Sequence, residues 1–170
     1  WSLNGNHHQG RKLYSVSKQT IAIICGGPSS EHEVSCVSAG GVLGGLDKKL
    51  FDPVLIGITK AGKWIALDNK YPLSIINKVM PTIEDNGTHV ELAEGGLTIN
   101  GAFRAIDCIF PVLHGEFGED GKIQQLLENA KIAYVGSGVK ASADAMDKAR
   151  AKELFSDAGM KVATGLVIEK

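Results

Sequence analysis

The stretch IAIICGGPSSEHEVS, residues 21–35, decides the fold that this sequence predicts. Its first five residues are apolar and rich in β-branched side chains, a composition typical of a buried parallel strand. Gly26, Gly27 and Pro28 then end the strand in a turn. The polar residues that follow have the character of a helix start. The stretch therefore predicts a strand, a turn and a helix in direct succession.

Ser30 and Glu33 have the spacing of a capping box, in which each side chain accepts a hydrogen bond from the other residue's main-chain N–H. We therefore expect the helix to begin near Ser30. The pair Gly40-Gly41 is expected either to permit close packing or to weaken the middle of this helix. Apolar positions continue one helical face at Val34, Val37, Val42 and Leu46.

Strand-like apolar runs and helical patterns alternate along the rest of the chain. The run AIDCIFPVLHG, residues 105–115, is apolar at successive positions, and we expect it to be the central strand. Further strands are predicted at 51–59, at 132–136 and at 161–169. A short segment at 64–67 follows a turn, and residues 90–101 are expected to form a β-hairpin or two short edge strands. Helices are predicted at 121–130, with Ile123, Leu126 and Leu127 facing inward, at 142–146, and at 147–158, where Gly159 ends the helix.

This alternation predicts an α/β fold with an open, mainly parallel sheet and helices on both faces. In such sheets ligands bind at the carboxyl ends of the strands. Two polar clusters follow predicted parallel strands: GGPSSEHE at residues 26–33 and HGEFGEDG at residues 114–121. We expect a functional site where these two clusters meet.

The composition narrows the class of function. The 170 residues are 44% apolar and carry a net charge of −1, so nothing favours binding to nucleic acid or to an anionic membrane. Cys25, Cys36 and Cys108 lie among apolar neighbours and are expected to be buried reduced thiols, as is typical of a cytoplasmic protein. Residues 1–20 lack the apolar core of a secretory signal, and we expect a flexible extension there.

Glu31, Glu33 and His114 are the titratable residues that need an explanation. The predicted cap accounts for Glu33. Glu31 could serve the helix dipole alone, but a carboxylate at the end of a strand can also hold a substrate ammonium group. A histidine that ends a strand is most often structural. The loop after His114, however, holds three glycines and three acids, and glycine allows a ligand to approach the backbone closely.

Three other kinds of site find little support. The glycines lack the spacing of a dinucleotide fingerprint, and the sequence contains no P-loop pattern. HEVSC, residues 32–36, resembles a zinc-protease motif but has Cys36 in place of the second histidine. Glu31 and Glu119 could form the carboxylate pair of a glycosidase, although nothing in their spacing favours them over other acids.

Four blocks, in this order, resemble the D-alanine–D-alanine ligase family: GGPSSEHEVS from residue 26, FPVLHGEFGEDGKIQ from 110, YVGSGVKASADAMDKARAK from 134 and AGMKVATGLVI from 158. The resemblance implies an enzyme that joins two D-alanines for peptidoglycan, using ATP and magnesium to form a D-alanyl phosphate. It implies a cytoplasmic homodimer with no nucleic-acid or membrane partner. It also implies a Rossmann-like pre-ATP-grasp domain at 21–138, followed at 139–170 by a linker and the first helix and strand of an ATP-grasp domain.

The resemblance also implies roles for individual residues. Glu31 matches the glutamate that pairs with the ammonium of the first D-alanine, and Val34 would flank its methyl group. His114 matches the histidine beside that substrate and the acyl phosphate. Ser35 and Glu119 match polar partners that orient these groups. In the MDK segment, Lys148 matches a lysine that contacts the ATP phosphates.

No metal ligand is assigned within the chain, since the family's magnesium ligands, adenine pocket and catalytic arginine are expected beyond residue 170. The chain alone is therefore expected to be inactive. Relatives that join D-alanine to D-lactate or D-serine remain an alternative. A non-catalytic binding or dimerisation module is another.

Overall fold

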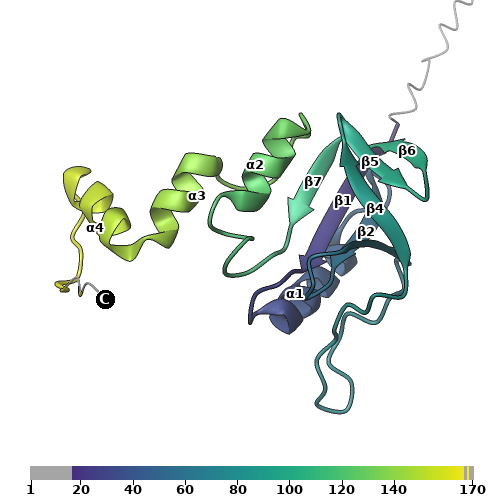
Figure 1. The fold of residues 1–170 in the computed structure, drawn as a ribbon, viewed down its shortest axis with the longest axis horizontal. Coiled ribbons are helices and arrows are strands. Elements are labelled where there is room, and N and C mark those ends of the chain that lie inside the picture. The colour runs from purple at the N-terminus through teal and green to yellow at the C-terminus, as the bar shows by residue number, and fades with distance from the viewer. Residues whose placement is uncertain (1–16, 167, 169–170) are drawn as a thin grey trace, which may run out of the picture.

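The computed structural model describes residues 17–166 and 168. Its core is one seven-stranded sheet with the strand order β6-β5-β4-β3-β2-β1-β7 (Figure 1). The strands are β1 Gln19–Gly26, β2 Phe51–Ile58, β3 Trp64–Leu67, β4 Thr88–Ala93, β5 Gly96–Ile99, β6 Ala102–Ala105 and β7 Cys108–Pro111. The helices are α1 His32–Gly45, α2 Lys122–Asn129, α3 Val139–Met146 and α4 Lys148–Asp157.

The part of the sheet that carries the two polar clusters is parallel. β1 pairs in parallel with both β2 and β7. From β2 outward the sheet continues as an antiparallel meander through β3, β4, β5 and β6. The α/β fold is confirmed, and the parallel pairings between its strands are those of β1 with β2 and β7. The predicted extension at 1–20 is too long, because Gln19 and Thr20 already pair with Phe51 and Asp52, whereas residues 1–16 lie outside the described part of the chain.

The prediction of the central strand was wrong. β1 is flanked on both sides by parallel strands, whereas β7 lies at the end of the strand order. Beyond β7 the segment predicted as a strand at 132–136 contributes a single bridge, between Tyr134 and Ile109. Ile109 is nevertheless fully buried, because α2 and this segment cover it. An apolar strand therefore need not be central when other elements cover its faces.

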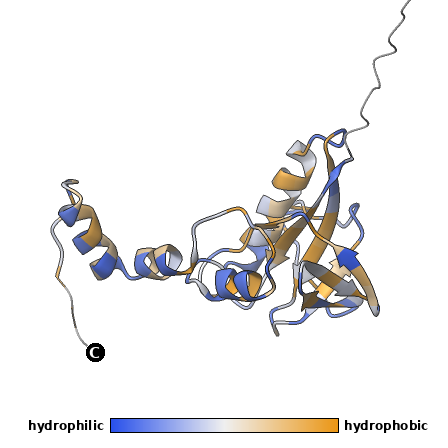
Figure 2. Ribbon diagram, turned by 90° about the horizontal axis from the view of Figure 1, so that it is seen from above, coloured by the Kyte–Doolittle hydropathy of each residue, from blue (hydrophilic) through white to orange (hydrophobic). Residues whose placement is uncertain are grey.

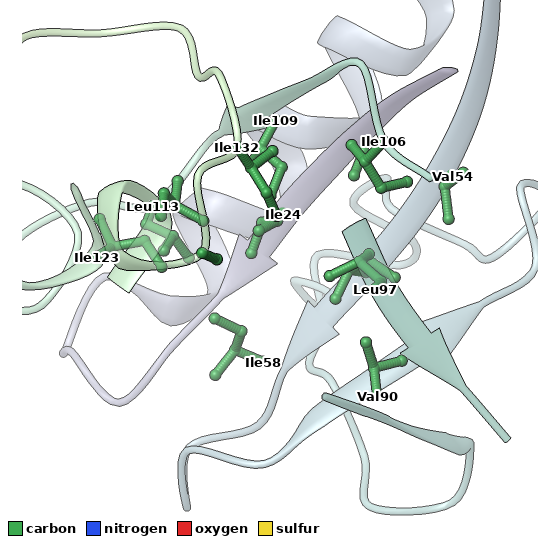
Figure 3. Packing of buried hydrophobic residues seen from close by; sticks show 14 residues of the cluster. Ile24, Val54, Ile58, Val90, Leu97, Ile106, Ile109, Leu113, Ile123 and Ile132 are labelled. Carbon is green, nitrogen blue, oxygen red and sulfur yellow. The ribbon is translucent and has the colours of Figure 1, made fainter. Parts of the chain in front are cut away.

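Alternate residues of β1 point to two separate apolar cores. Ala22 and Ile24 pack in one cluster with the α2 residues Ile123 and Leu127, on one face. Figure 3 shows Ile24 and Ile123 in this cluster. Ile23 and Cys25 pack on the other face, with α1. Helices therefore cover both faces, as predicted. One inward position on α2 was wrong: Leu126 is 40% exposed, and Gln124 is buried instead.

Close packing explains one glycine of α1. A Cβ at Gly40 would lie 2.8 Å from the carbonyl oxygen of Leu73, so this glycine allows the segment after β3 to cross the helix. Cys25 and Cys36 are buried free thiols in the core beneath α1, and Cys108 is only partly buried. A hydrogen bond that the Cys25 thiol donates to Cys36, together with burial, raises the pKa of Cys25.

Helices α3 and α4 project from the sheet in two perpendicular views (Figures 1 and 2). Both were predicted, and Gly159, with φ +77°, follows the end of α4. The strand predicted at 161–169 does not form over 161–166, where the described backbone has no regular pairing partner. Apolar side chains stay exposed here at Met146, Phe155 and Met160. Within the described residues, no helix has the length and apolar character needed to span a bilayer.

Candidate active site

Two loops meet at the carboxyl ends of β1 and β7, because these strands are parallel neighbours. The hydroxyl of Ser29 joins the loops: it donates to the carbonyl oxygen of His114 at 2.7 Å and accepts the main-chain N–H of Glu31 at 3.1 Å. The Glu31 carboxylate lies over Gly115, since a Cβ on that glycine would be 2.6 Å from Glu31 Oε2. Residues 31 and 114, far apart in sequence, thus come to one edge of the sheet.

The start of α1 differs from the predicted capping box. The helix begins at His32, and its N-cap residue, Glu31, makes no capping side-chain hydrogen bond within the described chain. Glu33 instead forms an ion pair with Lys60 at 2.6 Å, which lowers the pKa of Glu33. A lysine that follows the next strand therefore competes successfully for this carboxylate. Glu31 is exposed, so its carboxylate remains accessible to a ligand.

His32 is a residue whose role sequence analysis missed. It is fully buried, and its Nε2 accepts the main-chain N–H of Ile83 at 3.0 Å. Its Nδ1 therefore carries the proton and donates to the carbonyl oxygen of Gly27 at 2.7 Å. This neutral imidazole ties the loop after β1 to the segment between β3 and β4. The available signal was helical spacing, since His32 precedes the buried residues Cys36 and Ala39 by four and seven positions.

Ser35 and Val34 lie on different sides of α1. The Ser35 hydroxyl is fully buried, accepts the N–H of Gly26 at 2.8 Å and donates to the carbonyl oxygen of Val112. It therefore locks the ends of β1 and β7 together, which orients the loops but not their side chains directly. Val34 is 47% exposed and is available at the first turn of α1, near Glu31.

The imidazole of His114 has a partner that the sequence did not single out. The Oγ of Ser38 lies 3.1 Å from His114 Nε2. Ser38 follows Glu31 by seven residues, which is two helical turns, so both face the same edge of the sheet. This spacing was the available signal for Ser38.

The loop after His114 is held by its own acids. Glu119 accepts the main-chain N–H of Gly115 at 2.9 Å, which places Glu119 in support of the segment that contacts Glu31. Asp120 accepts the N–H groups of Phe117 and Lys122. Phe117 has φ +72°, an uncommon conformation for a residue with a side chain. These hydrogen bonds keep the loop in that conformation.

Asp120→Asn is expected to destabilise the fold at pH 7 by about 1 kcal/mol, because an amide cannot accept all the hydrogen bonds of a carboxylate. Burial raises the pKa of Asp120, but the two N–H donors and Lys122 outweigh it and the net pKa is lowered. A lowered folded pKa means that the stabilisation is complete above the unfolded value of about 3.9 and is lost as the pH falls through the folded pKa. Urea unfolding from pH 7 down to pH 2.5 measures this.

The matched control is Glu116→Gln, because Glu116 is largely exposed and, within the described part of the chain, forms an ion pair with Lys122 alone. A surface pair of this kind contributes little, so its loss should leave unfolding almost unchanged. A destabilisation by Asp120→Asn that persists unchanged at the lowest pH would contradict the assignment.

A cleft of about 410 Å³ lies between this loop and α3, lined by residues that include His114, Glu119, Gln124, Ser137 and Ser142. The Oε1 of buried Gln124 has no hydrogen-bond partner among the described residues. Lys148 lies elsewhere: it is exposed at the start of α4 and, with Lys152, lines a separate hollow of about 600 Å³. The described residues contain no group of three histidine, cysteine or acidic side chains that could bind a metal ion.

The fold and the paired loops define an α/β domain with a candidate site at the carboxyl edge of its parallel strands. The chain belongs to the D-ala D-ala ligase N-terminus family, whose model matches residues 20–137. It is 41% identical to the D-alanine–D-alanine ligase of Mycobacterium leprae, aligned over 92% of this chain and 45% of that protein. The corresponding protein of Mycobacterium bovis is 44% identical, over 87% and 43%.

Solved structures of related enzymes have the same fold. The D-Ala:D-Ser ligase VanG from Enterococcus faecalis is 34% identical with a TM-score of 0.73, over 87% of this chain and 44% of that one. The D-alanine-D-alanine ligase from Coxiella burnetii is 32% identical with a TM-score of 0.73, over 84% and 42%. The chain therefore spans less than half the length of the relatives it resembles.

Proposed function

We propose that this chain supplies the N-terminal part of an ATP-dependent ligase that joins two D-alanines, and that its own share is to bind the first D-alanine. The observation that carries the proposal is the position of the Glu31 carboxylate over Gly115, beside His114, at the meeting point of two parallel strands. A carboxylate pairs well with an α-ammonium group, and an imidazole can donate to an anionic oxygen.

The neighbouring residues fit a small amino-acid substrate. Val34 offers an exposed apolar side chain near Glu31 for the substrate methyl group. His114 would hold the carboxylate of D-alanine or, after activation, its acyl phosphate. Ser35 locks the two strand ends, and Glu119 holds the Gly115 amide, so both support the site from behind. Catalysis would then depend on the hydrogen bonds that hold the two loops in their relative positions.

ATP, when bound, would supply the phosphoryl group that activates the substrate carboxylate. Lys148 and Lys152 suit phosphate oxygens by charge, and both line one hollow at α4. The described residues do not fit a magnesium site, so no step is assigned to that ion within this chain. A cytoplasmic location, homodimer formation and a role in peptidoglycan synthesis belong to the same proposal.

The 170-residue chain itself tests the proposal. Titrating the ¹⁵N-labelled chain with D-alanine is expected to shift the amide signals of Glu31 and Gly115, while L-alanine at the same concentration shifts them much less. With ATP and D-alanine together, no phosphate release is expected. The absence of D-alanine shifts would contradict the binding role, and measurable turnover would contradict the view that the chain is only part of an enzyme.

A second candidate, a ligase that uses D-serine as the second substrate, is favoured by the similarity to VanG. The four blocks favour the dipeptide ligase, but D-lactate remains a further alternative as second substrate. A non-catalytic dimerisation module is a third candidate. Size-exclusion chromatography with light scattering separates it, since a module of that kind must dimerise while failing to bind D-alanine.

A further inference from the structure

The main chain and the ring of His114 are held by different side chains. Ser29 accepts the Glu31 amide and donates to the His114 carbonyl oxygen, and Glu119 holds the next amide, that of Gly115. These bonds place the main chain of the loop but leave the ring free to turn. The outer torsion of a histidine side chain has broad energy wells, so a contact with the ring itself is needed to orient it.

Ser38 makes that contact. Its Oγ lies 3.1 Å from His114 Nε2, and the residue is partly buried on α1. Among the described residues, no hydrogen bond reaches Nδ1 of the same ring. A neutral imidazole has one donor and one acceptor nitrogen, so a partner at one nitrogen determines the chemistry of the other. The contact with Ser38 therefore engages Nε2 of His114 and leaves Nδ1 available to a ligand.

We propose that Ser38 is a positioning residue: its hydroxyl donates to Nε2 of His114, which keeps the ring proton on Nδ1 for an anionic oxygen of the substrate. This inference rests on the proposed function. A hydroxyl suits the task because it can also accept a hydrogen bond when the imidazole becomes positively charged. A carboxylate in place of the Ser38 hydroxyl would favour the positively charged imidazolium, whether or not the substrate is bound.

The test is the tautomer of His114 in the full 170-residue chain. Two-bond ¹H–¹⁵N correlation spectra, recorded about two units above the ordinary histidine pKa of about 6.5, report which ring nitrogen carries the proton. His114→Gln assigns the signal among the five histidines of the chain. The wild type is expected to be protonated at Nδ1. Ser38→Ala is expected to move the population toward the Nε2-protonated form that an unconstrained imidazole prefers.

Two control variants test whether the change at His114 is specific to the loss of the Ser38 hydroxyl. Ser38→Thr keeps the hydroxyl and should keep the Nδ1-protonated form. Ser30→Ala removes an exposed hydroxyl from the loop that precedes α1 and should leave the His114 signals unshifted. For D-alanine, Ser38→Ala should raise the Kd roughly three- to tenfold, and Ser38→Thr and Ser30→Ala less than twofold.

An unchanged tautomer in folded Ser38→Ala, or a wild-type ring protonated at Nε2, would overturn the assignment even if D-alanine binds normally. If the wild type fails to bind D-alanine, the proposed function fails instead, while the tautomer comparison still decides whether Ser38 sets the ring.

Discussion

Glu31→Gln is expected to weaken D-alanine binding to this chain by roughly 10- to 100-fold. The variant keeps the shape of the side chain and removes its charge. A hydrogen bond between charged partners contributes about 1.5–3 kcal/mol, which corresponds to this range of affinity. The carboxylate is exposed and lies against Gly115, so the loss should come from the ligand contact rather than from the fold. The Kd is measured by titrating labelled protein with D-alanine.

Glu33→Gln is the matched control, because it makes the same chemical change two positions away. Its carboxylate is already paired with Lys60. We expect a small change in stability and a Kd for D-alanine within twofold of the wild type. Equal effects of the two variants, or an unaltered Kd in Glu31→Gln, would return Glu31 to a role at the helix terminus.

Gly26→Ala is expected to destabilise the chain by about 2–5 kcal/mol, more than any other single change considered for this domain. Gly26 ends β1 with φ +88°, a conformation that disfavours a residue with a Cβ. The added Cβ would also lie 2.3 Å from the carbonyl oxygen of Ile58. That carbonyl accepts the N–H of Gly27 at 2.8 Å, so neither side can move freely. Urea unfolding followed by circular dichroism measures the loss.

Gly41→Ala provides a control of opposite sign on the adjoining helix. Apart from its chain neighbours and the helix's own backbone, no described residue places an atom within 4 Å of a Cβ at Gly41, and alanine is favoured over glycine inside a helix. This variant should gain about 0.5–1 kcal/mol. A loss below about 1 kcal/mol in Gly26→Ala would show that the turn after β1 tolerates a side chain and that its geometry is not essential to the fold.

The local sequence pattern was sufficient to predict most of the helices and strands. The apolar run before Gly26 predicted β1, the hairpin glycines predicted β4 and β5, and the sequence around Gly159 predicted the end of α4. These features depend on interactions within a few residues, or on an alternation that any buried strand must have. The order of strands was not predicted correctly, because burial makes β7 look central although it lies at the end of the order.

The candidate site also combines features that local sequence predicts with contacts that depend on the tertiary structure. Glu31 and His114 could be selected from sequence, because acids, glycines and a histidine follow two apolar strands. Glu33 was given a helix cap on local spacing, but Lys60, which follows the neighbouring strand, provides a stronger partner. The buried hydrogen bond between Ile83 and His32 and the contact between Ser38 and His114 also join residues distant in sequence.

The sequence by itself determined the strand, turn and helix around residues 21–35, the family to which the chain belongs and the candidate residues of the proposed site. Only the tertiary structure decided which partner each polar side chain takes. Hydrogen bonds and ion pairs require contact, and contact between β1 and β7 arises from the parallel pairing of the whole sheet. That pairing makes Ser29 the link between the two loops and leaves Glu31, rather than Glu33, available at the edge.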